Sequence, residues 1–261
     1  MKERILRVLQ VGCGEMGSSH ARGYEKIDGY EIVGLVSRNS ASRERLNSEL
    51  KGNYDLFSDF GEALRITRPD VVSVCTYPNT HAPYAIMAME AGAHVFVEKP
   101  LADSAEAAET VVMAAARYNR KVVVGYILRQ HPSWVKFIEV AKTLGKPLVM
   151  RMNLIIQSSG ARWRKQKKMI ATMPPLVDCG VHYIDVMCQM TGSEPEYVSA
   201  VGAQLTDETT VPEHYNYGQL IVKFKDGSVG WYETGWGPMM SENAFFVKDV
   251  IGPRGSVSIV S

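Results

Sequence analysis

Short apolar runs alternate with amphipathic stretches through the first half of this chain. A bounded apolar run of roughly four to eight residues indicates a buried strand, whereas apolar residues spaced three and four apart indicate a helix. These patterns predict strands at residues 8–11, 31–36, 71–75, 94–97 and 122–126, a helical stretch containing His20, and helices at residues 63–66, 81–91 and 104–118. Ser104 is placed to cap the last helix. Strands and helices in alternation predict a parallel, doubly wound sheet.

The pattern changes after Tyr126, where strand-like segments follow one another. A helix is predicted at about residues 133–144, and strands at residues 148–157, 196–205, 215–224, 229–234, 244–251 and 257–260. Runs of strands with few helices are typical of an α+β domain with a large, mostly antiparallel sheet. We therefore expect two domains, residues 1–125 and residues 126–261, joined near Tyr126.

A glycine-rich loop separates the first predicted strand from the helical stretch that follows. Its residues are Gly12, Cys13, Gly14, Glu15, Met16 and Gly17, which form a G-x-G-x-x-G motif between a strand and a helix. In that setting the glycines permit a tight turn, a close approach to a pyrophosphate and close packing of the helix on the strand. The motif predicts a dinucleotide-binding Rossmann domain, and a glycine-rich turn in another α/β protein is the alternative.

The end of the second strand bears on the choice of dinucleotide. Roughly twenty residues past the glycines, an NAD-binding domain presents Asp or Glu to the ribose, but Ser37 and Arg38 occupy this position. A hydroxyl and a guanidinium suit a 2′-phosphate, so the sequence favours NADP over NAD. The alternative is an exposed arginine that begins a solvated helix, with Arg43 and Arg45 on its polar face.

Polar residues also follow two later strands of the first domain. Glu98 and Lys99 come directly after residues 94–97, and Pro100 prevents the strand from continuing. Ligands bind at the carboxyl ends of strands in open parallel sheets. A second loop with polar groups to line the nicotinamide side of a cofactor contains Thr76, Tyr77, Pro78, Asn79 and His81. The alternatives are a solvated Glu-Lys pair and a helix capped by Asn79 or Thr80.

Composition narrows the class of partner. The 261 residues are 46% hydrophobic and carry a net charge of +1, which gives no field to recruit nucleic acid or an anionic membrane. We therefore expect a small-molecule partner. There is no apolar run long enough to span a bilayer and no signal core at the start, and the four cysteines make no disulfide framework. These features favour a cytoplasmic protein with reduced cysteines.

The second domain offers a basic segment and an Asp/His pair. Residues 162–168 are predicted to form a basic loop, either solvated or closing over an anionic ligand. Prolines at 174 and 175 predict a helix start, and Asp178 and His182 would share one face of that helix. A histidine there can accept a hydroxyl proton and an aspartate can orient it. The alternatives are a helix-initiating Asp beside a packed His, and a zinc site built from Cys179, His182 and Cys188, whose spacing fits poorly.

Three motifs in this order, the glycine loop, Glu98-Lys99-Pro100 and Asp178-x-Gly180-x-His182-x-x-Asp185, resemble the Gfo/Idh/MocA family of NAD(P)-dependent oxidoreductases. The resemblance implies hydride transfer between nicotinamide and a secondary alcohol or ketone of a sugar, cyclitol or related polyol. It implies that Lys99 contacts the reacting oxygen, Glu98 the nicotinamide ribose, Asp178 the substrate, and that His182 is the acid/base. It adds Arg129 and the Arg162-Trp163 segment as candidate cofactor or substrate contacts. An NAD-dependent glycosidase and a non-catalytic dinucleotide sensor are the alternatives.

The chain departs from the family pattern at two places. A glycine-rich turn usually precedes the Asp of the last motif, whereas residues 173–176 read Met-Pro-Pro-Leu. Family members also continue beyond the strand matching residues 257–260, so the second domain is expected to be shortened. A homodimer or homotetramer through its open sheet is expected, with the face at Met150, Met152, Leu154 and Ile156 in contact.

Overall fold

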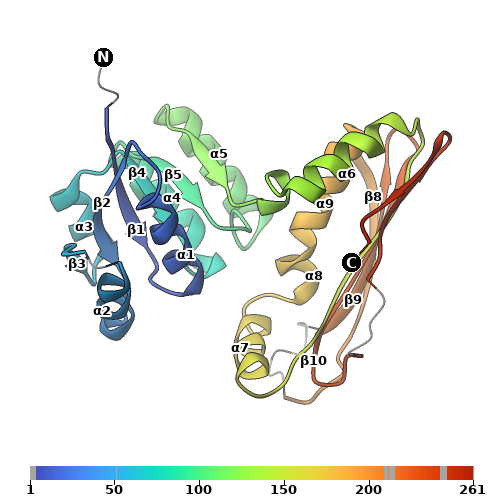
Figure 1. Cartoon of the computed structure of the whole chain (residues 1–261). Coiled ribbons are helices and arrows are strands. Elements are labelled where there is room, and N and C mark those ends of the chain that lie inside the picture. The colour runs from blue at the N-terminus through green and yellow to red at the C-terminus, as the bar shows by residue number, and fades with distance from the viewer. Residues whose placement is uncertain (1–3, 51, 209–210, 212–214, 242–245, 261) are drawn as a thin grey trace. The chain divides into compact units, whose positions relative to one another are not determined.

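The structure is a computed structural model that describes residues 4–50, 52–208, 211, 215–241 and 246–260. The chain divides into two compact units, Met1–Gly125 and Tyr126–Ser261, called unit 1 and unit 2 below (Figure 1). Among the described residues, no helix is long and apolar enough to cross a membrane.

Unit 1 is a parallel sheet covered by helices on both faces. Its strands are β1 Leu6–Val11, β2 Tyr30–Val36, β3 Leu56–Phe57, β4 Val71–Val74, β5 His94–Val97 and β6 Val122–Val124. Its helices are α1 Glu15–Tyr24, α2 Ser40–Glu49, α3 Phe60–Thr67, the 3₁₀ turn η1 Pro78–Thr80, α4 His81–Glu90 and α5 Ala105–Arg117. The strand order β3-β2-β1-β4-β5-β6, with every pair parallel, is that of a dinucleotide-binding Rossmann domain.

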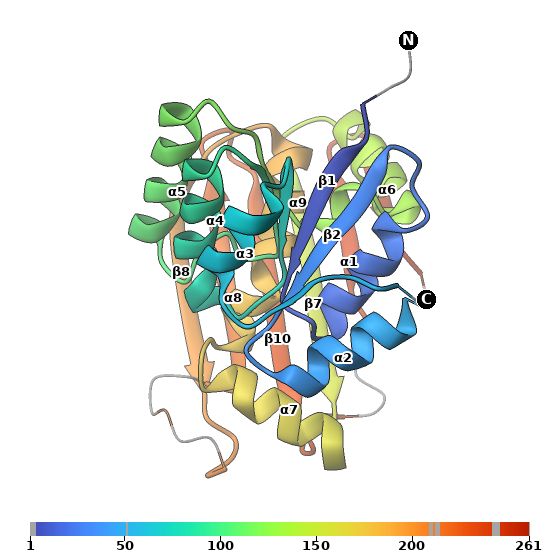
Figure 2. The same cartoon turned by 90° about the vertical axis from the view of Figure 1, so that its left-hand side faces the viewer.

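Two hydrophobic cores hold the layers of unit 1 together. Helices α3, α4 and α5 pack on one face around Leu9, Val72 and Val95, and helices α1 and α2 pack on the other around Leu35 and Leu46 (Figure 2). The doubly wound sheet is confirmed, and so is the cap on α5, where Ser104 accepts from the N–H of Ala107 at 3.1 Å. Helix α2 has little apolar pattern, since Leu46 is its only buried residue. The sequence therefore predicted it only as the solvated helix of the alternative interpretation of Arg38.

Unit 2 is a mostly antiparallel sheet with helices on one face. Its strands are β7 Val149–Gln157, β8 Pro195–Ala203, β9 Tyr217–Phe224, β10 Val229–Gly237, β11 Lys248–Gly252 and β12 Gly255–Ser258. Its helices are the 3₁₀ turn η2 Ile127–Arg129, α6 Pro132–Thr143, α7 Gly160–Ile170, α8 Pro175–Asp178 and α9 Gly180–Thr191. The strand order is β12-β11-β7-β10-β9-β8, in which only β7 and β10 run parallel. The expected fold class is confirmed for both sheets.

Two expectations for unit 2 were wrong. The basic segment forms helix α7 rather than a loop, because Trp163, Gln166 and Ile170 supply a buried face at helical spacing. The strand expected at residues 244–251 begins at Lys248, and its first two residues lie outside the described part of the chain.

The expected contact face of β7 was also wrong. Met150 and Met152 are fully buried in the core beneath the helices, with Leu154 and Ile156 packed against the same core. In the part of the chain that the structure describes, the helices of unit 2 leave the other face of the sheet uncovered. It exposes the large apolar side chains of Val149, Tyr197, Ile221, Val229 and Ile251. Since both faces of these strands are apolar, alternation alone did not show which face the helices cover.

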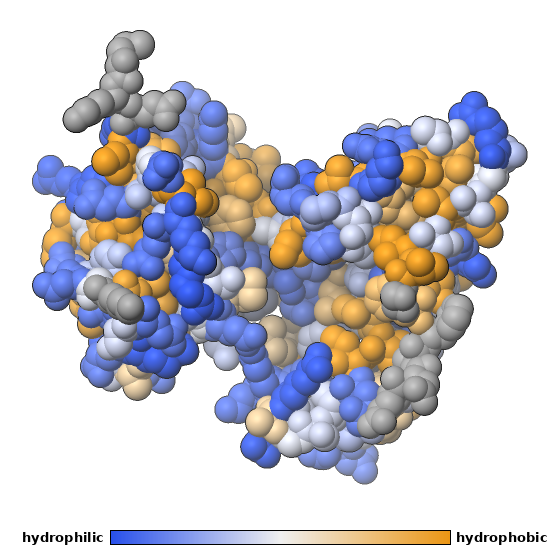
Figure 3. Space-filling view, viewed as in Figure 1, coloured by the Kyte–Doolittle hydropathy of each residue, from blue (hydrophilic) through white to orange (hydrophobic). Residues whose placement is uncertain are grey.

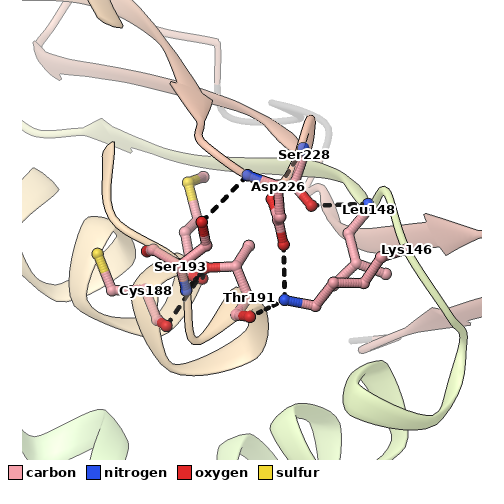
Figure 4. Close-up of polar contacts among 8 residues, drawn as sticks. Lys146, Leu148, Cys188, Thr191, Ser193, Asp226 and Ser228 are labelled. Atoms are coloured by element: carbon pink, nitrogen blue, oxygen red, sulfur yellow. Dashed lines mark hydrogen bonds and ion pairs between the residues drawn. The ribbon is translucent and has the colours of Figure 1, made fainter. Parts of the chain in front are cut away.

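A polar network ties the hairpin between β9 and β10 to the end of α9 (Figure 4). The Lys146 ammonium donates to the carbonyl of Thr191 and lies 2.6 Å from the Asp226 carboxylate. Asp226 also accepts from the N–H of Ser228, whose hydroxyl accepts from the N–H of Leu148 at 2.9 Å. Partial burial works against ionisation of Asp226, but Lys146 and Ser228 outweigh it and lower its pKa.

Candidate functional site

The carboxyl ends of four strands in unit 1 bring the predicted cofactor residues to one edge of the sheet. Val36, Val11, Val74 and Val97 are register partners across β2, β1, β4 and β5. The residues that follow them directly are Ser37, Gly12, Cys75 and Glu98. The ladder continues past the strand ends, since Gly12 donates to the Val36 carbonyl and Glu98 to the Val74 carbonyl. Motifs far apart in sequence therefore lie in one row.

At each position of the loop motif, the lack of a side chain has a different physical reason. Gly12 has a φ of +92°, and a Cβ there would lie 2.2 Å from the carbonyl oxygen of Cys75. A Cβ on Gly17 would lie 1.8 Å from the carbonyl oxygen of Gly12, so this glycine lets α1 pack on the loop. A Cβ on Gly14 would meet nothing within 4 Å. The absence of a side chain at Gly14 is therefore explained by space for a ligand rather than by packing.

The start of α1 fits the pyrophosphate of a dinucleotide. Gly14 is the N-cap residue and, as a glycine, supplies no side-chain cap to the first turn of the helix. The N–H groups of that turn and the helix dipole favour an anion at this position. The side chain of Cys13 points away from it, because its Sγ contacts the Val36 carbonyl at 3.5 Å. Burial raises the pKa of Cys13 to about 11, which favours the protonated thiol at neutral pH.

Arginines of α2 lie against the glycine loop and the end of β2. Arg43 donates to the carbonyl of Ser37, and Arg45 donates to the carbonyl of Cys13 at 3.1 Å. Both charges act to lower the pKa of Cys13, although burial outweighs them. Arg38 is exposed at the start of this segment. The alternative interpretation placed Arg43 and Arg45 on the polar face of a solvated helix, and in the structure both guanidinium groups also donate to backbone carbonyls beside the loop.

Glu98 is held by a residue that sequence analysis did not assign to the site. His20 of α1 lies 2.9 Å from the Glu98 carboxylate, and the N–H of Lys99 donates to the same carboxylate at 3.2 Å. Glu98 is 8% exposed. Burial works against its ionisation, but His20 and Lys99 outweigh burial and lower its pKa. Gly125 provides the space for the Glu98 carboxylate, because a Cβ at this position would lie 3.2 Å from a Glu98 oxygen.

The loop from Thr76 to His81 is fixed by hydrogen bonds of its own. The His81 ring is 1% exposed, with Nδ1 2.7 Å from the Pro100 carbonyl and Nε2 3.1 Å from the Thr76 carbonyl. Its side chain therefore supports the loop from within, which corrects the expectation of a direct cofactor contact. Thr80 is the N-cap of α4 without a side-chain cap bond, and its hydroxyl oxygen instead lies 2.7 Å from the Thr76 hydroxyl and 2.8 Å from the Tyr77 carbonyl. Tyr77 and Asn79 are exposed on this loop.

In unit 2, Asp178 and His182 flank a break between two helices. Asp178 ends α8 and His182 lies in the first turn of α9, with Cys179 between the helices. The single helix that was expected is wrong in this detail. A Cβ on Gly180, the first residue of α9, would lie 3.3 Å from the ring of Tyr232. Asp178 is 7% exposed and Cys179 Sγ lies 3.7 Å from its carboxylate, whereas His182 is half-buried.

An ion pair and an aromatic ring surround His182. The Tyr126 ring meets the His182 ring edge-on at a centroid distance of 6.2 Å. Arg129 forms a bidentate pair with Asp185 of α9, and its guanidinium lies 5.3 Å from the centre of the Tyr126 ring. Arg129 is thus bound within unit 2, where it anchors η2 to the helix that carries His182. Within the described residues, no three His, Cys, Asp or Glu side chains gather to hold a metal ion.

Unit 1 therefore gathers the glycine loop, Ser37 and Glu98 with Lys99, and unit 2 gathers Asp178 and His182. Trp163, which was expected in a mobile loop, is 5% exposed and packed in α7. The residues that sequence analysis missed are His20, Arg43, Arg45 and Tyr126. Three arginines within eight positions after β2 were the available signal for two of them, while His20 had none beyond its place in α1.

The sheet order, the glycine loop and the row of strand ends define unit 1 as a dinucleotide-binding Rossmann domain. The chain belongs to the GFO/IDH/MocA family. A family model described as an oxidoreductase family with an NAD-binding Rossmann fold matches residues 6–126, and a model of the GFO/IDH/MocA C-terminal domain matches residues 136–258. The family resemblance of the motifs is confirmed.

This chain is similar in sequence to known dehydrogenases and in structure to solved proteins. An inositol 2-dehydrogenase of Agrobacterium fabrum is 32% identical over 75% of this chain, which spans 56% of that protein. A UDP-N-acetylglucosamine 3-dehydrogenase of Acidithiobacillus ferrooxidans is 28% identical over 78% of this chain, which spans 60% of that protein. The structure of GenD2 from gentamicin A biosynthesis, in complex with NAD, is 25% identical and aligns with a TM-score of 0.86 over 99% of this chain and 73% of its own.

Proposed function

We propose that this protein transfers a hydride between a nicotinamide dinucleotide and a secondary alcohol or ketone of a sugar, cyclitol or related polyol. The observation that carries the proposal is the set of side chains this member of the family retains. Lys99 follows Glu98 at the ligand-binding edge of unit 1, and unit 2 carries Asp178 and His182 at the start of α9. Residues 1–125 would bind the dinucleotide, and residues 126–261 would bind the substrate.

The residues of unit 1 would hold the cofactor and polarise the substrate. When bound, a nicotinamide dinucleotide supplies the hydride acceptor or donor. The uncapped N-terminus of α1 and the open space at Gly14 would bind its pyrophosphate, and Glu98 would accept from the nicotinamide ribose. Thr76, Tyr77, Pro78 and Asn79 would border the nicotinamide through their loop. The Lys99 ammonium would offset negative charge on the substrate oxygen.

The residues of unit 2 would move the proton. During oxidation of an alcohol, His182 would accept the hydroxyl proton as the hydride leaves the carbon, and during reduction it would return that proton. Asp178 would bind a neighbouring substrate hydroxyl or orient His182. Arg129 would act mainly by holding η2 and Tyr126 beside α9, with a cofactor contact as its further expected role. The proposal requires Lys99 and His182 to reach the same substrate oxygen.

The proposed cofactor preference is NADP over NAD. Ser37 and Arg38 stand where a carboxylate would contact the ribose, and Arg43 and Arg45 add positive charge beside the loop. A charge-assisted hydrogen bond of roughly 1.5–3 kcal/mol corresponds to about tenfold to hundredfold discrimination. Titration of NADH and NADPH by nicotinamide fluorescence tests this directly. NADPH should bind more tightly, Ser37→Asp should reverse the preference, and equal affinities in the wild type would contradict it.

We further propose a homodimer or homotetramer formed through the uncovered face of the unit 2 sheet. That face exposes Tyr197 by 60% and Ile221 by 52% in the isolated chain. Ile221→Lys should lower the mass found by sedimentation, whereas the control Val112→Lys, at an exposed site on α5, should not. An unchanged mass for Ile221→Lys would exclude this face. The four free cysteines fit the reducing cytoplasm as the proposed compartment.

A screen of polyols with each dinucleotide tests the proposed reaction. Formation of reduced nicotinamide from at least one sugar or cyclitol is expected. Release of an aglycone without net reduction would identify the glycosidase, and tight dinucleotide binding with no turnover on any polyol or glycoside would identify the sensor.

A further inference from the structure

Helix α7 concentrates positive charge within a chain that is otherwise balanced. Its eleven residues include five basic side chains, Arg162, Arg164, Lys165, Lys167 and Lys168, and no acidic one. The net charge of the whole chain is only +1. Like charges three and four positions apart destabilise an isolated helix. Packing therefore stabilises the helix. Cations in its last turn, Lys167 and Lys168, also complement the helix dipole, whereas the charges of Arg162, Arg164 and Lys165 lie before that turn.

The inner face of α7 fixes the helix on unit 2. Trp163 and Ile170 are buried in the core of this unit. The indole Nε1 of Trp163 donates to Glu208 at 3.2 Å, and the Lys167 ammonium lies 2.5 Å from the same carboxylate. Gln166, also buried, accepts from the Ser158 hydroxyl. Helix α7 is thus a fixed platform, with Lys167 neutralised by Glu208.

The outer face of α7 presents the remaining cations. Helical spacing places Arg164, Lys165 and Lys168 side by side, with Arg162 at the margin, and all four are exposed. Hydrophilic residues cover this helix in the space-filling view (Figure 3). Among the described residues, no carboxylate forms an ion pair with Arg162, Arg164 or Lys168. Arginine and lysine side chains held on a fixed helix match the oxygens of an anionic ligand.

This row belongs to the same side of the sheet as the proposed acid/base pair. Helices α7, α8 and α9 all contact β10 and lie on one face of the sheet (Figure 1). Helix α7 ends at Ile170, and α8, which ends on Asp178, begins at Pro175. An anionic group on the substrate can therefore bind along α7 while another part of the same molecule reaches Asp178 and His182.

We propose that the substrate is a sugar or cyclitol that carries an anionic group, and that Arg164 and Lys168 bind this group. The shared chemistry is a phosphate, a carboxylate or a nucleoside diphosphate attached to the polyol. This inference rests on the proposed hydride transfer and adds a specificity-determining surface to it. Neutral polyols would be poorer substrates because they leave these cations solvated.

Matched pairs of substrates test the inference with the full chain. The pairs are glucose with glucose 6-phosphate, glucose with glucuronate, and N-acetylglucosamine with UDP-N-acetylglucosamine. The double variant Arg164→Gln/Lys168→Gln is compared with Lys142→Gln, which removes an exposed cation from α6 of the same unit. Because the replaced side chains are exposed, all variants should melt at the wild-type temperature.

The anionic member of at least one pair should have the higher kcat/KM. The double variant should raise its KM by roughly tenfold, leave kcat and the neutral partner unchanged, and reduce the salt dependence of binding. Lys142→Gln should behave as wild type. Equal use of both members of every pair, or a double variant without effect on the anionic one, overturns the inference.

Calorimetry separates this inference from the proposed reaction. If an anionic sugar binds in an α7-dependent manner but no polyol is oxidised, the inference stands and the hydride transfer fails. If neutral polyols are oxidised and the α7 variant changes neither binding nor KM, the hydride transfer stands and the inference fails.

Discussion

Loss of the hydrogen bond between His20 and Glu98 should destabilise unit 1 by about 1.5–3 kcal/mol. His20 contributes one hydrogen bond of 2.9 Å to a carboxylate that is 8% exposed. A hydrogen bond to a charged group contributes about 1.5–3 kcal/mol, and breaking a fully buried ion pair costs about 3–5 kcal/mol. The lower range applies because the N–H of Lys99 remains bound to Glu98.

The substitution must separate this bond from ring packing, since the His20 and Phe96 rings lie 4.8 Å apart. His20→Phe keeps an aromatic ring there and removes the polar contact. The control is His94→Ala, which removes a half-buried histidine whose Nδ1 accepts only from the N–H of Lys121. Urea unfolding at neutral pH should show the loss for His20→Phe and under about 1 kcal/mol for the control.

The pH dependence gives a second test. Glu98 has a lowered pKa in the folded protein, so the stability it contributes is present above its unfolded pKa of about 4.3 and is lost as pH falls through the folded value. The difference between wild type and His20→Phe should therefore shrink in acid. A loss below about 0.5 kcal/mol at neutral pH, or a difference that does not change with pH, would refute the assigned contact.

Three further predictions test other parts of the molecule. Gly14→Ala should leave the unfolding transition unchanged and weaken dinucleotide binding. Gly17→Ala should disrupt unit 1, because only the Cβ at position 17 would clash with the backbone, at 1.8 Å from the Gly12 carbonyl oxygen. Similar melting temperatures of the two variants would contradict this. Burial lowers the pKa of Lys248 to about 7 in the folded protein. Between about pH 7 and pH 10 the unfolded chain therefore binds more protons at this lysine than the folded protein does, so the free energy of unfolding should rise with pH across that range. Lys248→Met should lack this rise in urea titrations, and an identical pH slope would disprove the assignment. Lys146→Met should cost about 1–3 kcal/mol in urea unfolding because it removes the donor to the Thr191 carbonyl and the cation beside Asp226. Lys136→Met, from an exposed pair, should cost under about 0.5 kcal/mol, and equal losses would count against the network.

The fold of unit 1 was predictable because each strand is a short apolar run with a clear end. The predicted strand ends lie within two residues of the observed ones, since Gly12, Ser37 and Glu98 interrupt the runs. The two-residue strand β3 was not predicted, because so short a segment has no period to read. The site motifs were found for the same reason, as they follow strand ends directly.

Contacts that depend on the tertiary fold were not predictable. His20 and Glu98 are 78 positions apart, and only the packing of α1 on the sheet brings them together. The bond from Arg45 to the Cys13 carbonyl joins α2 to the glycine loop, which no helix pattern reveals. In unit 2, the predicted helix is divided at Cys179, and the next residue, Gly180, leaves space for the ring of Tyr232, which belongs to a strand that comes later in the chain.

Turnover of Lys99→Ala and His182→Ala tests the proposed hydride transfer most directly. Reduced nicotinamide is followed by absorbance with the best polyol from the screen, and dinucleotide affinity is measured on the same samples by fluorescence. Each variant should lose about a hundredfold to ten-thousandfold in kcat, because both side chains act on an oxygen whose charge changes as the hydride moves. Dinucleotide affinity should stay within a few-fold of wild type. Near-normal turnover of His182→Ala with that polyol would contradict the account.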